Sequence, residues 1–170
     1  MTISKRSVIL LLISVLTYGT AAMALIYYLP RYLRDYLGFD LAIIQLVTTI
    51  YPFSAIFLPQ ILGKYSDKIQ NRYLFILFGS IGASILYLAL FFTKDLVLIT
   101  FILIIYSMCG VSYRLSFTLY QELTKNNPKF VTFYNAANVF GWFLGSQFGG
   151  IFIDIYEISN IYIFLLIISL

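Results

Sequence analysis

Histidine is absent from this 170-residue sequence, and cysteine occurs once, at Cys109. The usual nitrogen and sulfur ligands of zinc are therefore almost entirely missing, and no disulfide can form within the sequence. Charged residues are also scarce, at 11% of the chain, whereas soluble domains carry about a quarter. The sequence thus predicts no metal site and no cofactor, and it excludes an ordinary water-soluble domain.

Hydrophobic residues make up 61% of the chain. They gather in runs that exceed the roughly 18 residues needed to span a bilayer, and the runs are continuous rather than alternating, which indicates helices and not barrel strands. The last run has ten residues, enough for about 15 Å, half of a bilayer core. We predict an all-α membrane bundle of five full spans and an incomplete sixth, at about 8–29, 41–62, 73–92, 96–119, 130–155 and 161–170.

The net charge of +4 arises mostly from short segments between the apolar runs. Seven lysines and arginines fall on one set of alternate segments, around residues 5–6, 64–72 and 125–129, and three fall on the other, at Arg31, Arg34 and Lys94. The positive-inside rule then predicts a cytoplasmic amino terminus. Because topology accounts for the basic residues, we predict the lipid bilayer, and not nucleic acid, as a partner.

A polar strip, Gly63 to Phe75, separates the second and third runs. It resembles the signature loop of the major facilitator superfamily, GxLaDrxGrkxxl, which lies between the same two helices. It departs from that pattern at Gln70 and Asn71, and it matches at Gly63, Ser66, Asp67, Lys68 and Arg72. The resemblance implies a helix bundle of this superfamily, here its amino-terminal six-helix half.

In that superfamily the loop holds the two halves together at the cytoplasmic face. Its contacts break when the transporter opens inward. The resemblance therefore implies a gating role for Asp67 and Arg72, within a loop that includes Gly63 and Lys68. From the residue types alone, Asp67 is expected to cap a helix amino terminus. The resemblance also implies that Glu122 bonds to Arg72, the alternative being a plain solvated acid.

Arg114 lies 18 residues after Leu96, about 27 Å along a 30 Å core. From there it is expected to extend to the cytoplasmic surface, the alternative being that it faces the cavity. The family pattern RxxqG is matched by Tyr106 to Gly110, with tyrosine in place of arginine. That departure argues against proton-coupled exchange.

Gly141, Gly145 and Gly149 recur every fourth residue, so they share one helix face and predict close packing of a second helix. The segment around them resembles the GxxxGPxxGG motif of antiporters, with Ser146 replacing the proline. Helix packing is the favoured interpretation, because glycines at this spacing are common in membrane helices.

Polar and aromatic residues inside the spans are candidates for a substrate cavity, because a buried amide is costly in lipid unless it bonds to a neighbour or meets water. Asn135 and Asn138 share one face, and both contact with substrate and a bond to an adjoining helix are open. The candidate cavity residues are Tyr18, Gln45, Tyr106, Arg114, Asn135, Asn138 and Trp142.

We therefore predict the amino-terminal half of a multi-pass permease of the cell membrane, which carries a small solute by alternating access with a second six-helix half on the same or another chain. The alternative is a non-transporting membrane module that uses a half-bundle for assembly. An enzyme is disfavoured, since the sequence shows no histidine, no paired intramembrane carboxylates and no serine with a base partner.

Overall fold

The structure is a computed structural model that describes residues 5–69 and 71–169, so Gln70 and Leu170 lie outside the described residues. All regular elements within those ranges are helical, which confirms the predicted all-α class. A π-helical turn, Tyr32–Tyr36, follows α1, and a 3-10 turn, Ile158–Asn160, precedes α7. The helices are α1 (Lys5–Arg31), α2 (Leu41–Ile69), α3 (Arg72–Phe92), α4 (Leu96–Cys109), α5 (Val111–Leu123), α6 (Pro128–Tyr156) and α7 (Ile161–Ser169).

Four helical stretches among the described residues are long and apolar enough to cross a membrane: Arg6–Tyr36, Leu41–Ile69, Arg72–Phe92 and Leu96–Leu123. The 29-residue α6 is as long as α2 but is not among these stretches, and the described part of α7 has nine residues. Large apolar side chains such as Phe78 and Ile85 are more than half exposed on the outside of the bundle. An apolar exterior of this kind matches a lipid environment, so the protein is a multi-pass membrane protein.

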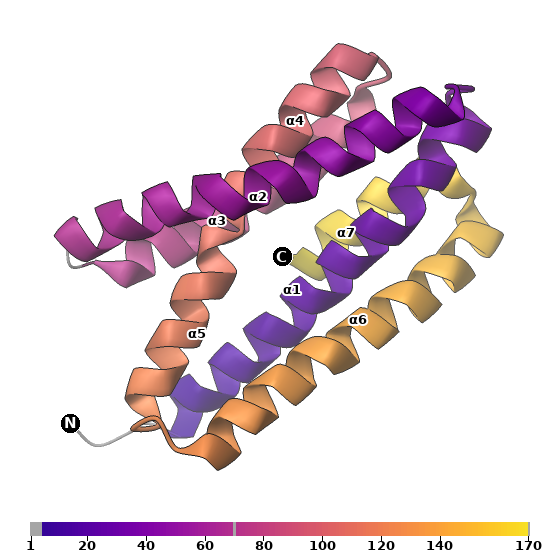
Figure 1. The fold of residues 1–170 in the computed structure, drawn as a ribbon. Coiled ribbons are helices and arrows are strands. Elements are labelled where there is room, and N and C mark those ends of the chain that lie inside the picture. Colours follow the sequence, from indigo (N-terminus) through magenta and orange to yellow (C-terminus); the bar gives the residue numbers. More distant parts are fainter. Residues whose placement is uncertain (1–4, 70, 170) are drawn as a thin grey trace.

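Successive long helices run in opposite directions, as Figure 1 shows. The start of α1, the α2–α3 turn and the α5–α6 turn therefore lie toward one end, called here the N-terminal end of the bundle. Helices α1 and α6 lie side by side and run parallel, while α2 lies beside α4. Helix α3 packs against α4, α5 and α7.

Two predicted boundaries are wrong because helices continue where we expected them to end. Pro30 lies inside α1, since a proline removes only its own N–H and the π turn after Arg31 carries the chain onward. Helix α2 continues through most of the polar strip to Ile69. Asp67 therefore lies in the last turn of α2 and is no helix cap. Instead, the side chain of Asn71 accepts a hydrogen bond from the Leu74 N–H at 3.2 Å and caps α3.

We predicted the fourth span as one continuous helix. Instead, it breaks at Gly110 into α4 and α5. At the break the N–H of Gly110 donates to the Ser107 carbonyl at 3.2 Å, and the Ser112 hydroxyl donates to the Cys109 carbonyl at 2.9 Å. A Cβ added at Gly110 would lie 3.6 Å from Cγ of Pro59 in α2. The break in the fourth span thus faces Pro59 of α2.

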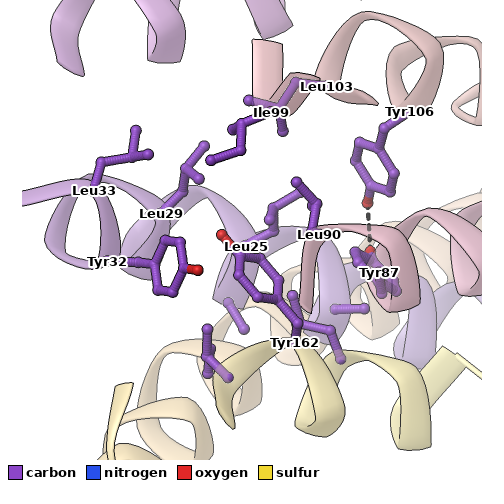
Figure 2. Close-up of a cluster of buried hydrophobic side chains, with 14 of the residues drawn as sticks. Leu25, Leu29, Tyr32, Leu33, Tyr87, Leu90, Ile99, Leu103, Tyr106 and Tyr162 are labelled. Carbon is purple, nitrogen blue, oxygen red and sulfur yellow. Dashed lines mark hydrogen bonds between the residues drawn. The ribbon is translucent and has the colours of Figure 1, made fainter. Parts of the chain in front are cut away.

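The main hydrophobic core joins α1, α2, α3, α4 and α7 (Figure 2). Its largest fully buried side chains include Tyr32, Tyr87 and Tyr162. The hydroxyls of Tyr87 and Tyr106 share a buried hydrogen bond of 2.6 Å, which satisfies two polar groups that would be costly in an apolar interior. This core holds α4 against α3.

Candidate functional site

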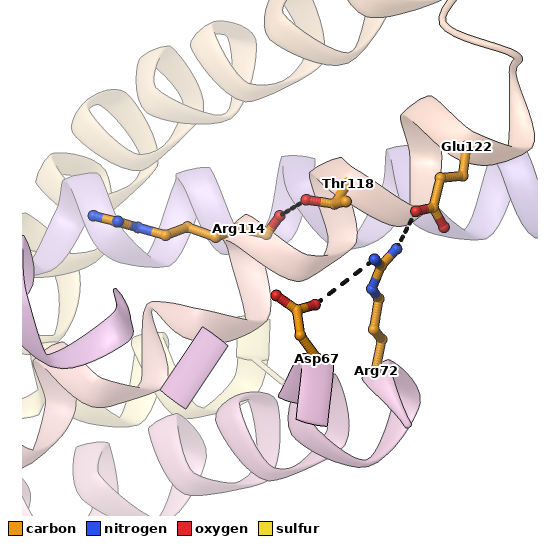
Figure 3. Close-up of polar contacts among 5 residues, drawn as sticks. All are labelled: Asp67, Arg72, Arg114, Thr118 and Glu122. Carbon is orange, nitrogen blue, oxygen red and sulfur yellow. Dashed lines mark hydrogen bonds and ion pairs between the residues drawn. The ribbon is translucent and has the colours of Figure 1, made fainter. Parts of the chain in front are cut away.

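Three charged side chains meet at the N-terminal end of the bundle and are called here the charged clip: Asp67, Arg72 and Glu122 (Figure 3). Arg72, the first residue of α3, pairs with Asp67 in α2 at 3.8 Å and hydrogen-bonds Glu122 near the end of α5. Glu122 is therefore an ion-pair partner and not merely a solvated acid. Since the side chains are 28 to 68% exposed, each pair is worth about 0 to 1 kcal/mol, weak enough to break and re-form.

The other predicted residues of the strip take no part in the clip. Lys68 is exposed in the last turn of α2, and no ion pair joins it to the residues that the structure describes. Gly63 is helical, and a Cβ placed there would meet nothing within 4 Å. Ser66 is fully buried, and its hydroxyl has no hydrogen-bond partner within the described residues.

We expected Arg114 to extend to the membrane surface, but it bonds to a neighbouring helix instead. Its guanidinium points away from the clip, and Nη2 donates to the carbonyl of Ala55 in α2 at 3.1 Å (Figure 3). Pro59, four residues beyond Ala55, has no N–H, so that carbonyl lacks its helical donor. Arg114 of α5 therefore supplies the hydrogen bond that the proline removes from α2.

The three glycines of α6 lie against α1. Added Cβ atoms at Gly141 and Gly145 would overlap the backbone carbonyl oxygens of Leu16 and Thr20. Gly149 faces the ring of Tyr28, whose hydroxyl donates to the Ser146 carbonyl at 2.5 Å. The two backbones therefore approach too closely for side chains larger than hydrogen along this seam.

An open cleft runs beside this seam, between α1, α2, α5 and α6. Four of the seven predicted cavity residues line it: Tyr18, Asn135, Asn138 and Trp142. The other lining residues were not predicted, namely Ala22, Met23, Ile26, Tyr51, Tyr113 and Val139. All ten lining residues are uncharged: four are aromatic, two are asparagines and four are aliphatic.

The remaining three predicted residues lie elsewhere. Tyr106 is 2% exposed and packs behind the cleft, with its ring 5.5 Å from that of Tyr51. Gln45 lies on a different face of α2, in a shallow pocket formed by that helix alone. Arg114 binds α2, as described above.

The two asparagines differ in their surroundings. Asn135 is exposed toward the cleft, whereas Asn138 is 7% exposed and packs on Gly19 of α1, where an added Cβ would lie 2.9 Å from its Oδ1. That oxygen has no hydrogen-bond partner within the described residues. Asn138 thus packs in the helix contact, and Asn135 is the amide that is exposed in the cleft.

A stacked pair of rings separates the cleft from a smaller inner pocket. Tyr18 and Tyr113 line both spaces, and their ring centroids are 5.2 Å apart at an interplanar angle of 13°. Hydroxyl groups of α1, α3 and α5 surround the inner pocket, including those of Ser14, Ser80 and Ser116. The two rings are therefore shared by the walls of the cleft and of the inner pocket.

Apolar helices of membrane length, with a charged clip at one end and a cleft between them, define a multi-pass helical membrane protein. A family model for the Major Facilitator Superfamily matches residues 10–170. The chain therefore belongs to this superfamily, as the signature strip indicated, and members of the superfamily are in general membrane transporters rather than enzymes. Searches of curated proteins and of solved structures found no match.

Proposed function

We propose that this chain is the amino-terminal half of a secondary active transporter that moves a small solute across the cell membrane by alternating access. The observation that carries the proposal is the clip, in which Arg72 ties the α2–α3 turn to the end of α5. A link of exposed ion pairs can open and close at small cost, as a gate must in every cycle.

The cleft supplies one wall of the transport site. Its Trp142 is 45% exposed, and Asn135 is exposed as well, so these side chains are available to a solute and to an opposing surface. In this proposal a second six-helix half, on the same or another chain, forms the other wall, and the halves rock around a site near the bilayer midplane.

The proposed orientation places the amino terminus and the clip in the cytoplasm. Two exposed lysines lie at opposite ends of the bundle. Lys68 lies beside the clip, and Lys94 lies in the turn between α3 and α4. We expect Lys94→Cys, and not Lys68→Cys, to react with a membrane-impermeant maleimide on intact cells. Cys109 is 3% exposed and should contribute little background. Labelling of Lys68→Cys from outside would reverse the orientation and remove the gating assignment.

Alternating access itself is tested at the cleft. In membranes, Asn135→Cys should react with an impermeant reagent added to either side, because the cleft of a transporter opens to both sides in turn. Asp67→Asn should shift that reactivity at least about twofold toward the clip side, since it removes one partner of Arg72. The control is Phe78→Cys, an exposed apolar position of α3 away from the cleft, which should stay unreactive from both sides. Reactivity of Asn135→Cys from one side only would favour the non-transporting module.

A further inference from the structure

We propose that the cleft binds an uncharged solute that has a flat, ring-shaped apolar face and a polar edge with both a hydrogen-bond donor and an acceptor. This inference rests on the proposed function, in which the cleft is one wall of the transport site. It assigns a chemical class to the solute from three properties of that wall, namely its aromatic rings, its amides and its lack of charge.

Aromatic rings from all four helices reach the cleft. Tyr18 comes from α1, Tyr51 from α2, Tyr113 from α5 and Trp142 from α6. The rings of Tyr18 and Tyr113 are stacked nearly in parallel, so each ring covers part of one face of the other, and the rest of the pair lines the cleft. A flat apolar face gains dispersion and quadrupole interactions against aromatic rings, beyond the burial of area.

Asn135 supplies the polar contact. Its exposed amide carries a carbonyl that accepts and an NH2 group that donates. No described side chain hydrogen-bonds to this amide, so both functions are available to a solute. A group of the same kind on the solute, such as a carboxamide, an imide or a vicinal hydroxyl and carbonyl, satisfies both together.

The wall offers nothing to balance a formal charge. A charged group that leaves water for such a surface loses its hydration, and contact with aromatic rings returns only part of that loss, even for a cation. The nearest arginine in the sequence, Arg114, follows Tyr113 but is bound to the Ala55 carbonyl and does not line the cleft. An uncharged solute avoids the loss.

Three small probes of one shape test the class: benzamide, benzoate and benzylamine, which near neutral pH carry no charge, a negative charge and a positive charge. Each is titrated into the purified full-length protein, and the fluorescence of Trp142 reports binding. We expect benzamide to bind at least about tenfold more tightly than either charged probe. Trp142→Phe should remove the benzamide-dependent part of the signal, which locates the response at the cleft.

Asn135→Leu, of similar volume, is the second variant. It should weaken benzamide by about fivefold or more, because the donor and the acceptor of the amide are lost together. Equal or tighter binding of benzoate or benzylamine overturns the proposed class, and so does a failure of benzamide to bind. Neither result tests the transporter proposal, which depends on the reactivity of Asn135→Cys from both sides. Failure of the solute class and failure of the transporter proposal are therefore distinguishable.

Discussion

Gly145→Ala is expected to lose at least about 2 kcal/mol of folding free energy, the largest effect of any single methyl group in the bundle. The new Cβ would overlap the carbonyl oxygen of Thr20 and lie 3.1 Å from the backbone nitrogen of Ala24. These are main-chain atoms of α1, so no side chain can rotate away and the two helices must separate. The measurement is thermal unfolding of the detergent-purified protein, together with its extracted yield.

Gly63→Ala and Gly149→Ala are the matched controls, since each adds the same methyl group to a membrane helix. At Gly63 the methyl meets nothing within 4 Å, so the better helix propensity of alanine should make this variant neutral or more stable by up to about 1 kcal/mol. At Gly149 it meets the ring of Tyr28, which can move, and an intermediate loss is expected. Equal losses at Gly63 and Gly145 would contradict the close approach of α1 and α6.

Arg114→Met should destabilise the protein by about 1 to 3 kcal/mol, because it leaves the Ala55 carbonyl without a donor in an apolar medium. Pro59→Ala restores an N–H at position 59, which can donate to that carbonyl within α2. In the Pro59→Ala background we therefore expect Arg114→Met to cost less than half as much. A double-mutant cycle of unfolding free energies measures the coupling.

Pro52→Ala provides the control for this cycle. Pro52 also lies inside α2, but the carbonyl it frees is that of Thr48, two turns from Ala55. Arg114→Met combined with Pro52→Ala should therefore be additive within about 0.5 kcal/mol. Additivity with Pro59→Ala as well would show that Arg114 stabilises the bundle by some other contact.

The fold class and the family could be predicted from the sequence because they depend on features that a membrane makes unambiguous. Long apolar runs have few alternatives in lipid, and charges gather in the short segments between them. The spacing of Asp67 and Arg72 in the polar strip likewise pointed to the signature of the superfamily, and the structure brings both together with Glu122.

Other parts of the site could not be predicted, for physical reasons. Where a helix is apolar on nearly every face, as α2 is around Tyr51, periodicity does not say which face meets lipid, so Tyr51 could not be told from the other tyrosines of the spans. The direction of Arg114 depends on a carbonyl in a different helix, freed by Pro59, and no local pattern near residue 114 reports it. The break at Gly110 depends in the same way on neighbours in α1 and α2.

The parallel seam between α1 and α6 has a consequence for biosynthesis. Leu16 and Gly141, whose backbones meet there, are 125 positions apart in the sequence (141 minus 16), and four other helices are made between them. A nascent chain that is translated from its amino terminus must therefore hold the α1 face bare until the ribosome has passed residue 149. During that interval the uncovered face of α1 is the surface on which a membrane chaperone or the insertion machinery would act.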